Sequence, residues 1–412
     1  MVEHAHLGQE FAPLQAPQLE NPYPFYARAR REEPVFFSEA LQAWIVTRYD
    51  DVRAVVGQPD IFSNKDTLRP VVQFTPETFQ ELSKGFGFLP VITNTDGEEH
   101  MRFRTPLNQA FLPARMRAME SDIRTVANRL IDGFYKDGKA EIISQFTGPL
   151  PQEIILRLFD VPLTQLAQYK QWCDDIKALT MSPLTPERQL ECARSFVAFQ
   201  HAVAGLVEER KHSSKDDVIS CLANVHHNPA KPLSVPEIVN TAMGTILAGH
   251  DTTTSLLGTA LYILLGTPHL WQTLCKHPEN IPNAIEEVLR FDSSVHLFFR
   301  TALREVTIGG VTIPEGAFLL VSYASANHDE TQFKDAEKFD LHRSPNHHIA
   351  FGYGTHFCVG APLARLVSRI ALESLVQRLP HPRLKADQNI YHIPQLAFHG
   401  LARLEIEWDV TQ

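Results

Sequence analysis

The residues best suited to chemistry lie in a glycine-rich segment around Cys358. Residues 351–360 read Phe-Gly-Tyr-Gly-Thr-His-Phe-Cys-Val-Gly, and the glycines let the backbone turn sharply and approach a ligand closely. The apolar pattern of residues 361–378 predicts a helix immediately afterwards. A cysteine just before a helix has its thiolate stabilised by the exposed N–H groups and the helix dipole. Such a thiolate suits an iron ligand, since thiolate donation favours cleavage of an O–O bond.

A second set of candidate residues interrupts a long apolar stretch. Residues 248–253 read Ala-Gly-His-Asp-Thr-Thr. Threonine is a mediocre helix former, and a buried aspartate is costly unless it has a partner, so their position needs an explanation. A hydroxyl beside a titratable acid could deliver protons to a reacting group. Taken alone, the segment also fits a threonine that is hydrogen-bonded within an ordinary core.

Together the two segments resemble the cytochromes P450. F-x-x-G-x-H-x-C-x-G, here followed by Leu-Ala-Arg at residues 363–365, is the haem-binding signature of that family, and A-G-x-D-T is the motif of its oxygen-binding helix. The resemblance implies haem b as cofactor, with Cys358 as the axial iron ligand. It also implies that Thr252 hydrogen-bonds dioxygen and that Asp251 helps to admit protons from solvent. For His250 we favour a hydrogen bond within the fold over a place in a proton path.

The family's E-x-x-R helix motif is matched by Glu287 and Arg290. Side chains three residues apart lie on one face of a helix and can pair. The resemblance implies that this pair is buried and holds the region of the cysteine loop in place. A third partner is expected from the segment that follows, and the sequence leaves open whether Lys338 or Arg343 supplies it.

Four residues match positions that bind the haem propionates in this family. His100 and Arg104 form its H-x-x-x-R motif, and Arg300 and His356 match two further positions. Cations and N–H donors that converge on carboxylates form charge-assisted hydrogen bonds. The other positions that we expect to contact haem are Ala248, Gly249, Phe351 and Gly360.

The resemblance also indicates which segments contact substrate. These are the loop before His100, the middle of the long helix, the segment before Arg300 and the C-terminal turn. The residues in them are Phe86, Phe88, Leu89, Thr245, Ala248, Val295, Leu297, Phe298, Phe299 and Phe398. A site lined by several phenylalanines favours an apolar or aromatic small molecule of modest size. For any single residue, membership of the ordinary core is an equally good interpretation.

The elements that must position these residues can be read from local patterns. Ser234, a proline two residues on and Glu237 form a capping box, and the helix that they begin runs to about Leu265, a length of roughly 48 Å. Residues 42–49 and 404–408 alternate as strands, and Gly-Gly within residues 307–312 predicts a hairpin. We therefore expect an α+β, predominantly α-helical cytochrome P450 fold with a long central helix over haem and minor antiparallel sheets. Residues 1–412 are expected to form one haem domain without a fused reductase.

Composition excludes several classes of protein. The net charge is −10, with 38 basic against 48 acidic residues, which argues against a nucleic-acid partner. The five cysteines include no C-x-x-C pair, so neither a disulfide scaffold nor a structural zinc site is expected. No secretory signal and no run of apolar residues long enough to span a membrane is evident. We expect a soluble, cytoplasmic monomer.

The expected activity is insertion of one atom of O2 into a hydrophobic small molecule, by hydroxylation or epoxidation. Electrons would come from a separate ferredoxin or flavodoxin with its NAD(P)H-dependent reductase. Two alternatives stay open: a peroxide-driven peroxygenase, and a catalytically silent haem-bearing binding or recruitment module. A basic docking face for an acidic ferredoxin is a further hypothesis, and the residues proposed for it are Arg102, Arg115, Arg117, Arg365 and Arg369.

Overall fold

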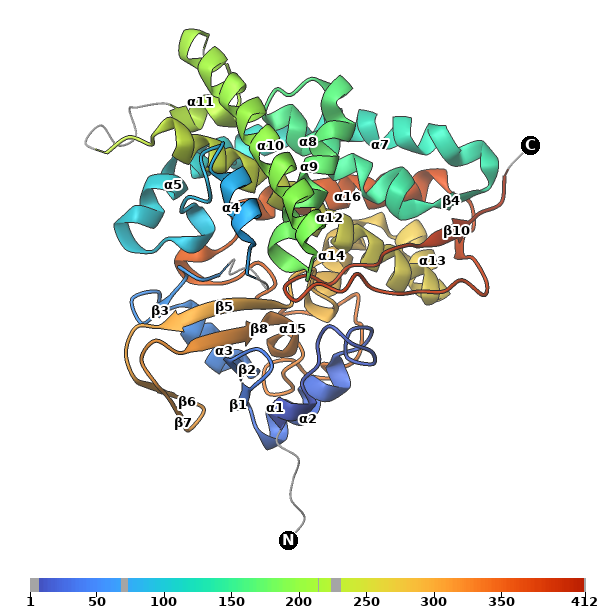
Figure 1. Ribbon diagram of the computed structural model, residues 1–412. Helices are drawn as coiled ribbons and strands as arrows, with labels where there is room; N and C mark the ends of the chain where they lie inside the picture. The colour runs from blue at the N-terminus through green and yellow to red at the C-terminus, as the bar shows by residue number, and fades with distance from the viewer. Residues whose placement is uncertain (1–6, 68–72, 214, 224–230, 411–412) are drawn as a thin grey trace. The chain divides into compact units, whose positions relative to one another are not determined.

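The computed structural model describes residues 7–67, 73–213, 215–223 and 231–410 (Figure 1). They form two compact units, each assembled from separate stretches of the chain. The first unit comprises Met1–Ser63, Arg117–Leu150 and Thr252–Gln412, and the second comprises Asn64–Met116 and Pro151–Asp251. None of the helices in the described residues is both long enough and apolar enough to cross a membrane.

The first unit is organised around a five-stranded sheet. In spatial order its strands are β1 (Val35–Ser38), β2 (Ala43–Val46), β8 (Phe318–Ser322), β5 (Leu297–Ala302) and β3 (Phe62–Ser63). The pair β2–β8 is parallel, whereas the other pairs are antiparallel. The prediction of antiparallel sheets is therefore wrong for this sheet, which is mixed, because β2 pairs with a strand more than 270 residues further along the chain.

Two smaller sheets belong to the same unit. Strands β6 (Val306–Ile308) and β7 (Val311–Ile313) form the expected hairpin. Its two turn residues, Gly309 and Gly310, have φ values of 56° and 83°, as a tight two-residue turn requires. The third sheet has the order β4 (Lys139–Glu141), β10 (Glu405–Glu407) and β9 (Arg383–Leu384), and β10 confirms the strand expected near the C-terminus.

Apolar clusters cover both faces of the five-stranded sheet. On one face Ile45 and Leu320 pack with residues of α2 (Tyr23–Glu32). On the other face Val46 and Val321 pack with residues of α3 (Tyr49–Val56). The alternation of side chains along a strand separates the two clusters. The remaining helices of this unit are α1 (Leu7–Glu10), α7 (Glu120–Phe134), α13 (Pro268–Lys276), α14 (Ile281–Phe291), α15 (Tyr323–Ala326) and α16 (Ala361–Arg378).

In its described residues the second unit contains helices but no named strand. Its helices are α4 (Pro76–Leu82), α5 (Gly97–Ala110), α9 (Leu166–Met181), α10 (Pro186–His212) and α11 (Val218–Ala223). Three further helices continue from one unit into the other: α6 (Pro113–Ala118), α8 (Pro149–Leu158) and α12 (Val235–Gly266). Helix-rich architecture with minor sheets confirms the predicted fold class.

Helix α12 begins and ends where its local sequence predicts. The backbone N–H of Glu237 donates to Oγ of Ser234 over 3.4 Å, and the N–H of Ser234 donates to the Glu237 carboxylate over 2.7 Å. This reciprocal pair is the capping box, which satisfies two N–H groups that the first turn leaves without helical partners. The helix then runs for 32 residues.

A buried carboxylate on α14 organises the chain before the cysteine loop. The guanidinium of Arg290 donates to both oxygens of Glu287 over 2.9 and 2.8 Å. Arg290 also donates to the backbone carbonyls of Asn327 and Ala336. Because both side chains are essentially inaccessible to water, these contacts are what makes their charges tolerable in the interior.

The third member of this network is Arg343. Its Nε lies 3.1 and 3.0 Å from the two oxygens of Glu287. The ammonium of Lys338 instead lies 3.4 Å from exposed Asp335, and only the backbone carbonyl of Lys338 accepts from Arg290. The question that the sequence left open is thus answered in favour of Arg343.

We expect Arg343→Met to lower the free energy of unfolding by about 3–5 kcal/mol, because it leaves part of a buried carboxylate's charge uncompensated. Urea denaturation of the purified protein measures this loss. Lys338→Met is the matched control, since its side chain is 77% exposed, and it should change stability by no more than about 0.5 kcal/mol. Equal losses in the two variants would contradict the assignment of Arg343 as the third partner.

Candidate active site

Cys358 lies in the first unit, directly before α16, as the sequence predicts. Its thiol is exposed, and its backbone N–H donates to the carbonyl of Phe351 over 2.8 Å. Gly352 and Gly354 have φ values of 75° and 72°, which residues with side chains rarely adopt. A side chain on Gly354 would also meet the backbone of Gly57 at 3.5 Å, so this turn packs closely against the end of α3. The loop therefore presents an accessible, soft sulfur donor from a constrained backbone, which fits a thiolate ligand of haem iron.

An ion pair supports this loop from α14. Arg365 on α16 donates two hydrogen bonds of 2.7 Å to Glu286, and its guanidinium lies over the ring of Phe351 at 4.6 Å. His348 contacts the same carboxylate at 3.0 Å. Burial by itself would raise the pKa of Glu286, but Arg365 and His348 reverse this and lower the pKa to about 2. Phe351 and Arg365 are thus parts of the support of the loop.

Arg300 and His356 also belong to the first unit. Arg300 is buried on β5, where it donates to the carbonyl of Phe299 over 2.6 Å and to the hydroxyl of Tyr323 over 3.3 Å. A guanidinium has five N–H donors in a planar fork and can also serve a carboxylate. His356 is half-buried at the end of the short turn that precedes Cys358. Their chemistry fits the propionate groups of haem.

The second unit places His100 and Arg104 on α5, one turn apart. His100 is buried, whereas Arg104 is half-buried and donates to Asn108 over 2.8 Å. A buried cationic or N–H donor beside an arginine one turn along the helix suits an anionic ligand. These two residues fit the role of propionate donors that the sequence assigns to them.

The proposed basic docking face is not supported at Arg102. Its side chain is only 7% exposed, and it forms ion pairs with Glu99 and Glu237. A charge that is buried and paired within the fold cannot steer an acidic partner effectively. Arg115 is likewise paired, with Asp216. Local periodicity could not reveal these partners, because Glu237 lies 135 residues from Arg102 and Asp216 lies 101 residues from Arg115.

Asp251 lies within a set of charged side chains in the second unit. Lys177 on α9 places its Nζ 2.7 Å from Oδ2 of Asp251, and Nε2 of His250 lies 3.1 Å from Oδ1. Burial by itself would raise the pKa of Asp251, but His250 and Lys177 hold it well below the usual value. The carboxylate is therefore ionised at neutral pH and accepts hydrogen bonds on both oxygens. Lys177 has no motif around it, so the sequence did not reveal it.

Gly249 has a packing role in addition to the predicted one. A side chain at this position would meet Cδ1 of Ile155 at 2.6 Å, closer than real contacts of this kind. Glycine therefore allows the close approach of α8 to α12, and its contact with haem stays a prediction. The neighbouring Ala248 is exposed, and Thr245 is half-buried with its hydroxyl bonded to the carbonyl of Thr241 over 2.7 Å. Ala248 and Thr245 remain candidates for contact with haem or substrate.

The candidate substrate residues Phe86 and Phe88 lie in a segment that is held by a residue that the sequence did not reveal. The side-chain amide of Gln200 on α10 accepts from the N–H of Phe86 and donates to the carbonyl of Gly87, both over 2.8 Å. It also donates to Asn240 on α12 over 3.2 Å. The ring of Phe88 packs against other rings and is 46% exposed. One amide thus fixes the backbone that carries Phe86 and Phe88.

The candidate substrate residues of the first unit divide into two groups. Val295 forms a β-bridge with Phe398, and the rings of Phe298 and Phe398 lie edge to face at 6.1 Å. Leu297 and Phe299 are buried in the apolar cluster beside α2. Leu297 and Phe299 therefore lie on the face of the sheet opposite Phe298, because alternate residues of β5 face opposite sides, and substrate contact at these two positions stays a prediction.

Thr252, the first residue of α12 that belongs to the first unit, is half-buried. Its carbonyl accepts a hydrogen bond of 2.8 Å from the hydroxyl of Ser294. Ser255 lies three residues further along α12, close to Gly400 of the C-terminal segment. A side chain on Gly400 would meet Oγ of Ser255 at 2.4 Å. The segments that carry Val295 and Phe398 are therefore packed against α12 next to Thr252.

Comparison with known proteins gives concordant results. Residues 36–399 match the family model described as Cytochrome P450. The chain is 36% identical over 370 residues to cytochrome P450 YjiB of Bacillus subtilis, covering 88% of each protein. It is 35% identical over 346 residues to mycinamicin IV hydroxylase/epoxidase of Micromonospora griseorubida, covering 83% of each. Among solved structures, cytochrome P450 CREJ in complex with (4-ethylphenyl) dihydrogen phosphate superposes with a TM-score of 0.92 and 30% identity, covering 98% of this chain and 100% of that one.

We expect Lys177→Met to raise the pKa of Asp251, because the carboxylate keeps its burial and loses one of its two partners. A double-mutant cycle of Lys177→Met with Asp251→Asn compares free energies of unfolding. The coupling free energy that it gives at pH 7 should be about 1–3 kcal/mol. It should disappear as the pH falls through the depressed pKa of Asp251 and the carboxylate gains a proton.

The control for this cycle is the exposed pair Lys211–Glu208 on α10, whose atoms are 2.6 Å apart. An exposed helical pair of this kind should couple by only about 0.3–0.5 kcal/mol. Coupling of the same size in both cycles would show that Lys177 does not control the charge of Asp251.

Proposed function

The chain belongs to the cytochrome P450 family of haem-thiolate oxidoreductases, which bind haem b, and on that premise we propose that Cys358 is its iron ligand and a hydrophobic small molecule its substrate. The reaction is insertion of one atom of O2 into that molecule, by hydroxylation or epoxidation. The observation that carries the proposal is the exposed thiol of Cys358, held by a constrained glycine-rich turn at the start of α16. Bound haem supplies the iron at which dioxygen is activated.

Four residues have chemistry suited to the propionates of the cofactor. The proposed donors are His100, Arg104, Arg300 and His356. Burial of Arg300 strengthens this assignment, because a guanidinium away from water is stabilised by an anion, and buried His100 can offer an N–H donor.

We assign the handling of protons to Asp251 and Thr252, consecutive residues of α12. Asp251 is ionised and accepts from Lys177, whose side chain is 16% exposed, and from His250. Because a carboxylate with so low a pKa is a weak base, its proposed part is to hold the N–H donors of Lys177 and His250 in place beside Thr252. The hydroxyl of Thr252 can donate to oxygen. His250 forms the contacts within the fold that the sequence favoured, with Asp251 and with the carbonyl of Ile246, and through Asp251 it belongs to the proposed set.

The proposed proton relay, formed by Asp251 and Thr252, also distinguishes the monooxygenase from its alternatives. A peroxygenase receives peroxide together with its protons and needs no path that delivers them. A binding module without turnover has no use for an ionised aspartate between a lysine and a histidine. The pair of contacts at Asp251 therefore supports an enzyme that is driven by electrons from a separate ferredoxin or flavodoxin.

The proposed substrate is apolar and of modest size. Phe86, Phe88, Val295, Phe298 and Phe398 offer aromatic and aliphatic contacts, and all of them are partly accessible rather than buried in a core. A few such side chains with few charges favour hydrophobic ligands. Among the related proteins, one is named for mycinamicin IV and another holds (4-ethylphenyl) dihydrogen phosphate, which joins an aryl group to a charged phosphate, so the proposed class rests on the side chains of this chain.

Cys358→His should abolish the strong red shift of the ferrous–CO absorption band that thiolate ligation causes, because imidazole replaces sulfur at the iron. Spectra of the reduced, CO-treated protein test this. Cys275→Ser is the control, since Cys275 is also an exposed cysteine of the first unit, and it should keep the wild-type band. Persistence of the band in Cys358→His would exclude Cys358 as the ligand.

Thr252→Ala should divert electrons into hydrogen peroxide, because a donor to oxygen is lost while reduction continues. Product formation should fall by about 100-fold or more as consumption of NAD(P)H persists. Measuring product, peroxide and NAD(P)H together gives the coupling. Thr254→Ala, two residues further along the same helix, should remain coupled, and full coupling in Thr252→Ala would mean that the relay is misassigned.

A further inference from the structure

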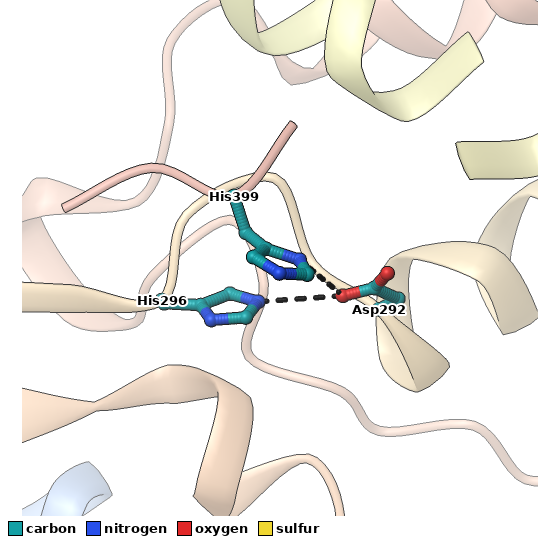
Figure 2. A group of neighbouring side chains, drawn as sticks. All are labelled: Asp292, His296 and His399. Carbon is teal, nitrogen blue, oxygen red and sulfur yellow. Dashed lines mark hydrogen bonds and ion pairs between the residues drawn. The ribbon is translucent and has the colours of Figure 1, made fainter. Parts of the chain in front are cut away.

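A buried cluster of Asp292, His296 and His399 lies in the first unit, outside the residues assigned to oxygen chemistry (Figure 2). Asp292 ends α14, His296 precedes β5, and His399 belongs to the C-terminal segment. Nε2 of His296 and Nδ1 of His399 lie 3.4 and 3.0 Å from the same oxygen, Oδ1 of Asp292. Nε2 of His399 lies 3.0 Å from the carbonyl of Leu19. One carboxylate oxygen thus joins the turn between α14 and β5 to the C-terminal segment, and His399 extends the contact to the backbone of Leu19.

The surroundings of the cluster are aromatic and titratable. The hydroxyl of Tyr23 donates to the same oxygen of Asp292 over 2.7 Å. The ring of His399 lies between those of His296 and His392, with centroids 4.3 and 3.8 Å away. The other titratable groups that face the cluster or Tyr23 are Glu20, which lies 2.7 Å from His392, Tyr26 from α2, and His328 and Glu337 from the segment after α15.

The arrangement suits a proton better than a metal ion. A cation bound by two imidazoles must lie in the planes of both rings, about 2 Å from each nitrogen. The rings of His296 and His399 are stacked with only 23° between their planes and centroids 4.3 Å apart, so an ion in the plane of one ring would lie off the plane of the other. Both rings do direct a nitrogen at Asp292 (Figure 2), as hydrogen bonding requires.

The charges indicate where the proton lies. Burial by itself would lower the pKa of His399, but Asp292 reverses this and raises it. Burial and the nearby charge of His399 lower the pKa of His296 to about 4. Burial and His399 also lower the pKa of His392. Of the three stacked imidazoles, the central ring of His399 therefore keeps its positive charge to the highest pH, opposite the carboxylate of Asp292, whose pKa lies well below the usual value.

The cluster is connected to the candidate substrate residues through the backbone. The N–H of His296 donates to the carbonyl of Ala397 over 2.9 Å, and the N–H of His399 donates to the carbonyl of Ser294 over 3.0 Å. These bonds flank the bridge between Val295 and Phe398. The cluster therefore determines how the two segments that carry these residues pair.

We propose that Asp292 and His399 are positioning residues of the substrate pocket, and that a proton shared between them holds together the segments that carry Val295 and Phe398. The role of the pocket rests on the proposed function, whereas the pairing of the segments does not. Neither residue contacts substrate in this proposal. The affinity for an uncharged ligand should nevertheless depend on pH.

The direction of that dependence follows from the two histidines. The ion pair of His399 contributes fully below the ordinary histidine pKa of about 6.5 and is lost as the pH rises through the raised pKa of His399. His296 must stay neutral, so the cluster weakens as the pH falls from about 6.5 towards the lowered pKa of about 4. The pairing should therefore be tightest near neutral pH and should loosen on both sides.

The test is hydrogen exchange of the haem-loaded protein, followed by mass spectrometry in peptides covering residues 294–299 and 392–401. Asp292→Asn should exchange there about tenfold faster at pH 7 after correction for the intrinsic rate, with the alkaline loss of protection abolished. Its ferrous–CO band should stay unchanged. Asp409→Asn is the control, because it removes the carboxylate of an exposed pair with His381 and should exchange as the wild type does.

A second variant keeps the proposal testable if Asp292→Asn folds poorly. His296→Gln retains a donor for Asp292 but cannot titrate, so it should keep its protection at pH 7 and lose the part of the acid limb that His296 contributes, while the part due to His392 remains. Protection that is independent of pH in the wild type, or unchanged in Asp292→Asn, would overturn the proposal. So would stoichiometric zinc in the purified protein, since the site would then hold a metal.

Binding of 4-ethylphenol, followed by the spin-state change of haem, separates this proposal from the proposed function. Weaker binding of 4-ethylphenol to Asp292→Asn supports the positioning role, provided that the control Asp409→Asn binds it as the wild type does. Absence of binding to the wild type would count against the proposed substrate class and leave the exchange experiment to decide on the cluster.

Discussion

The charge of Glu287 has to be compensated inside the protein, and much of the first unit follows from that requirement. Arg290 and Arg343 approach the carboxylate, and in doing so they bind the backbone of the long irregular stretch between α15 and the cysteine loop. The adjacent Glu286 forms an ion pair with Arg365, which follows that loop in the chain. Two consecutive carboxylates of one helix therefore hold the chain before and after Cys358. A glycine-rich loop has little regular structure of its own, so its shape depends on these side chains.

What could be predicted from the sequence is what is encoded locally. The start of α12 is written in Ser234 and Glu237, and the hairpin turn in Gly309 and Gly310, because capping and positive φ concern only neighbouring residues. The parallel pairing of β2 with β8 could not be predicted, since no local pattern specifies a partner strand so far away. The family resemblance indicated segments near substrate, but it did not separate Phe298 from Phe299, which the pleat of β5 directs to opposite faces. Partners such as Lys177 were missed for the same reason, because a lysine on a helix surface carries no mark of the aspartate that it meets.

Three buried or half-buried carboxylates illustrate three ways of stabilising negative charge. Glu287 is met by guanidinium groups that never lose their protons, so its environment is constant across ordinary pH. Asp251 is met by the ammonium of Lys177 and the imidazole of His250. Asp292 is met by two imidazoles, which hold its pKa well below the usual value, and by a phenol. The permanence of the charge thus decreases from the residue with a structural role to those with a proposed part in turnover and in shaping the pocket.

The hydrogen bonds of Gln200 have a consequence for how the candidate substrate residues can change in evolution. It holds the segment of Phe86 and Phe88 with an amide, which has no proton to gain or lose near neutral pH, whereas the segment of Phe398 depends on His399. The two aromatic segments are anchored by unrelated residues on different parts of the chain. Descendants of this gene could therefore change one segment while leaving the other intact, and acquire new substrates in small inherited steps.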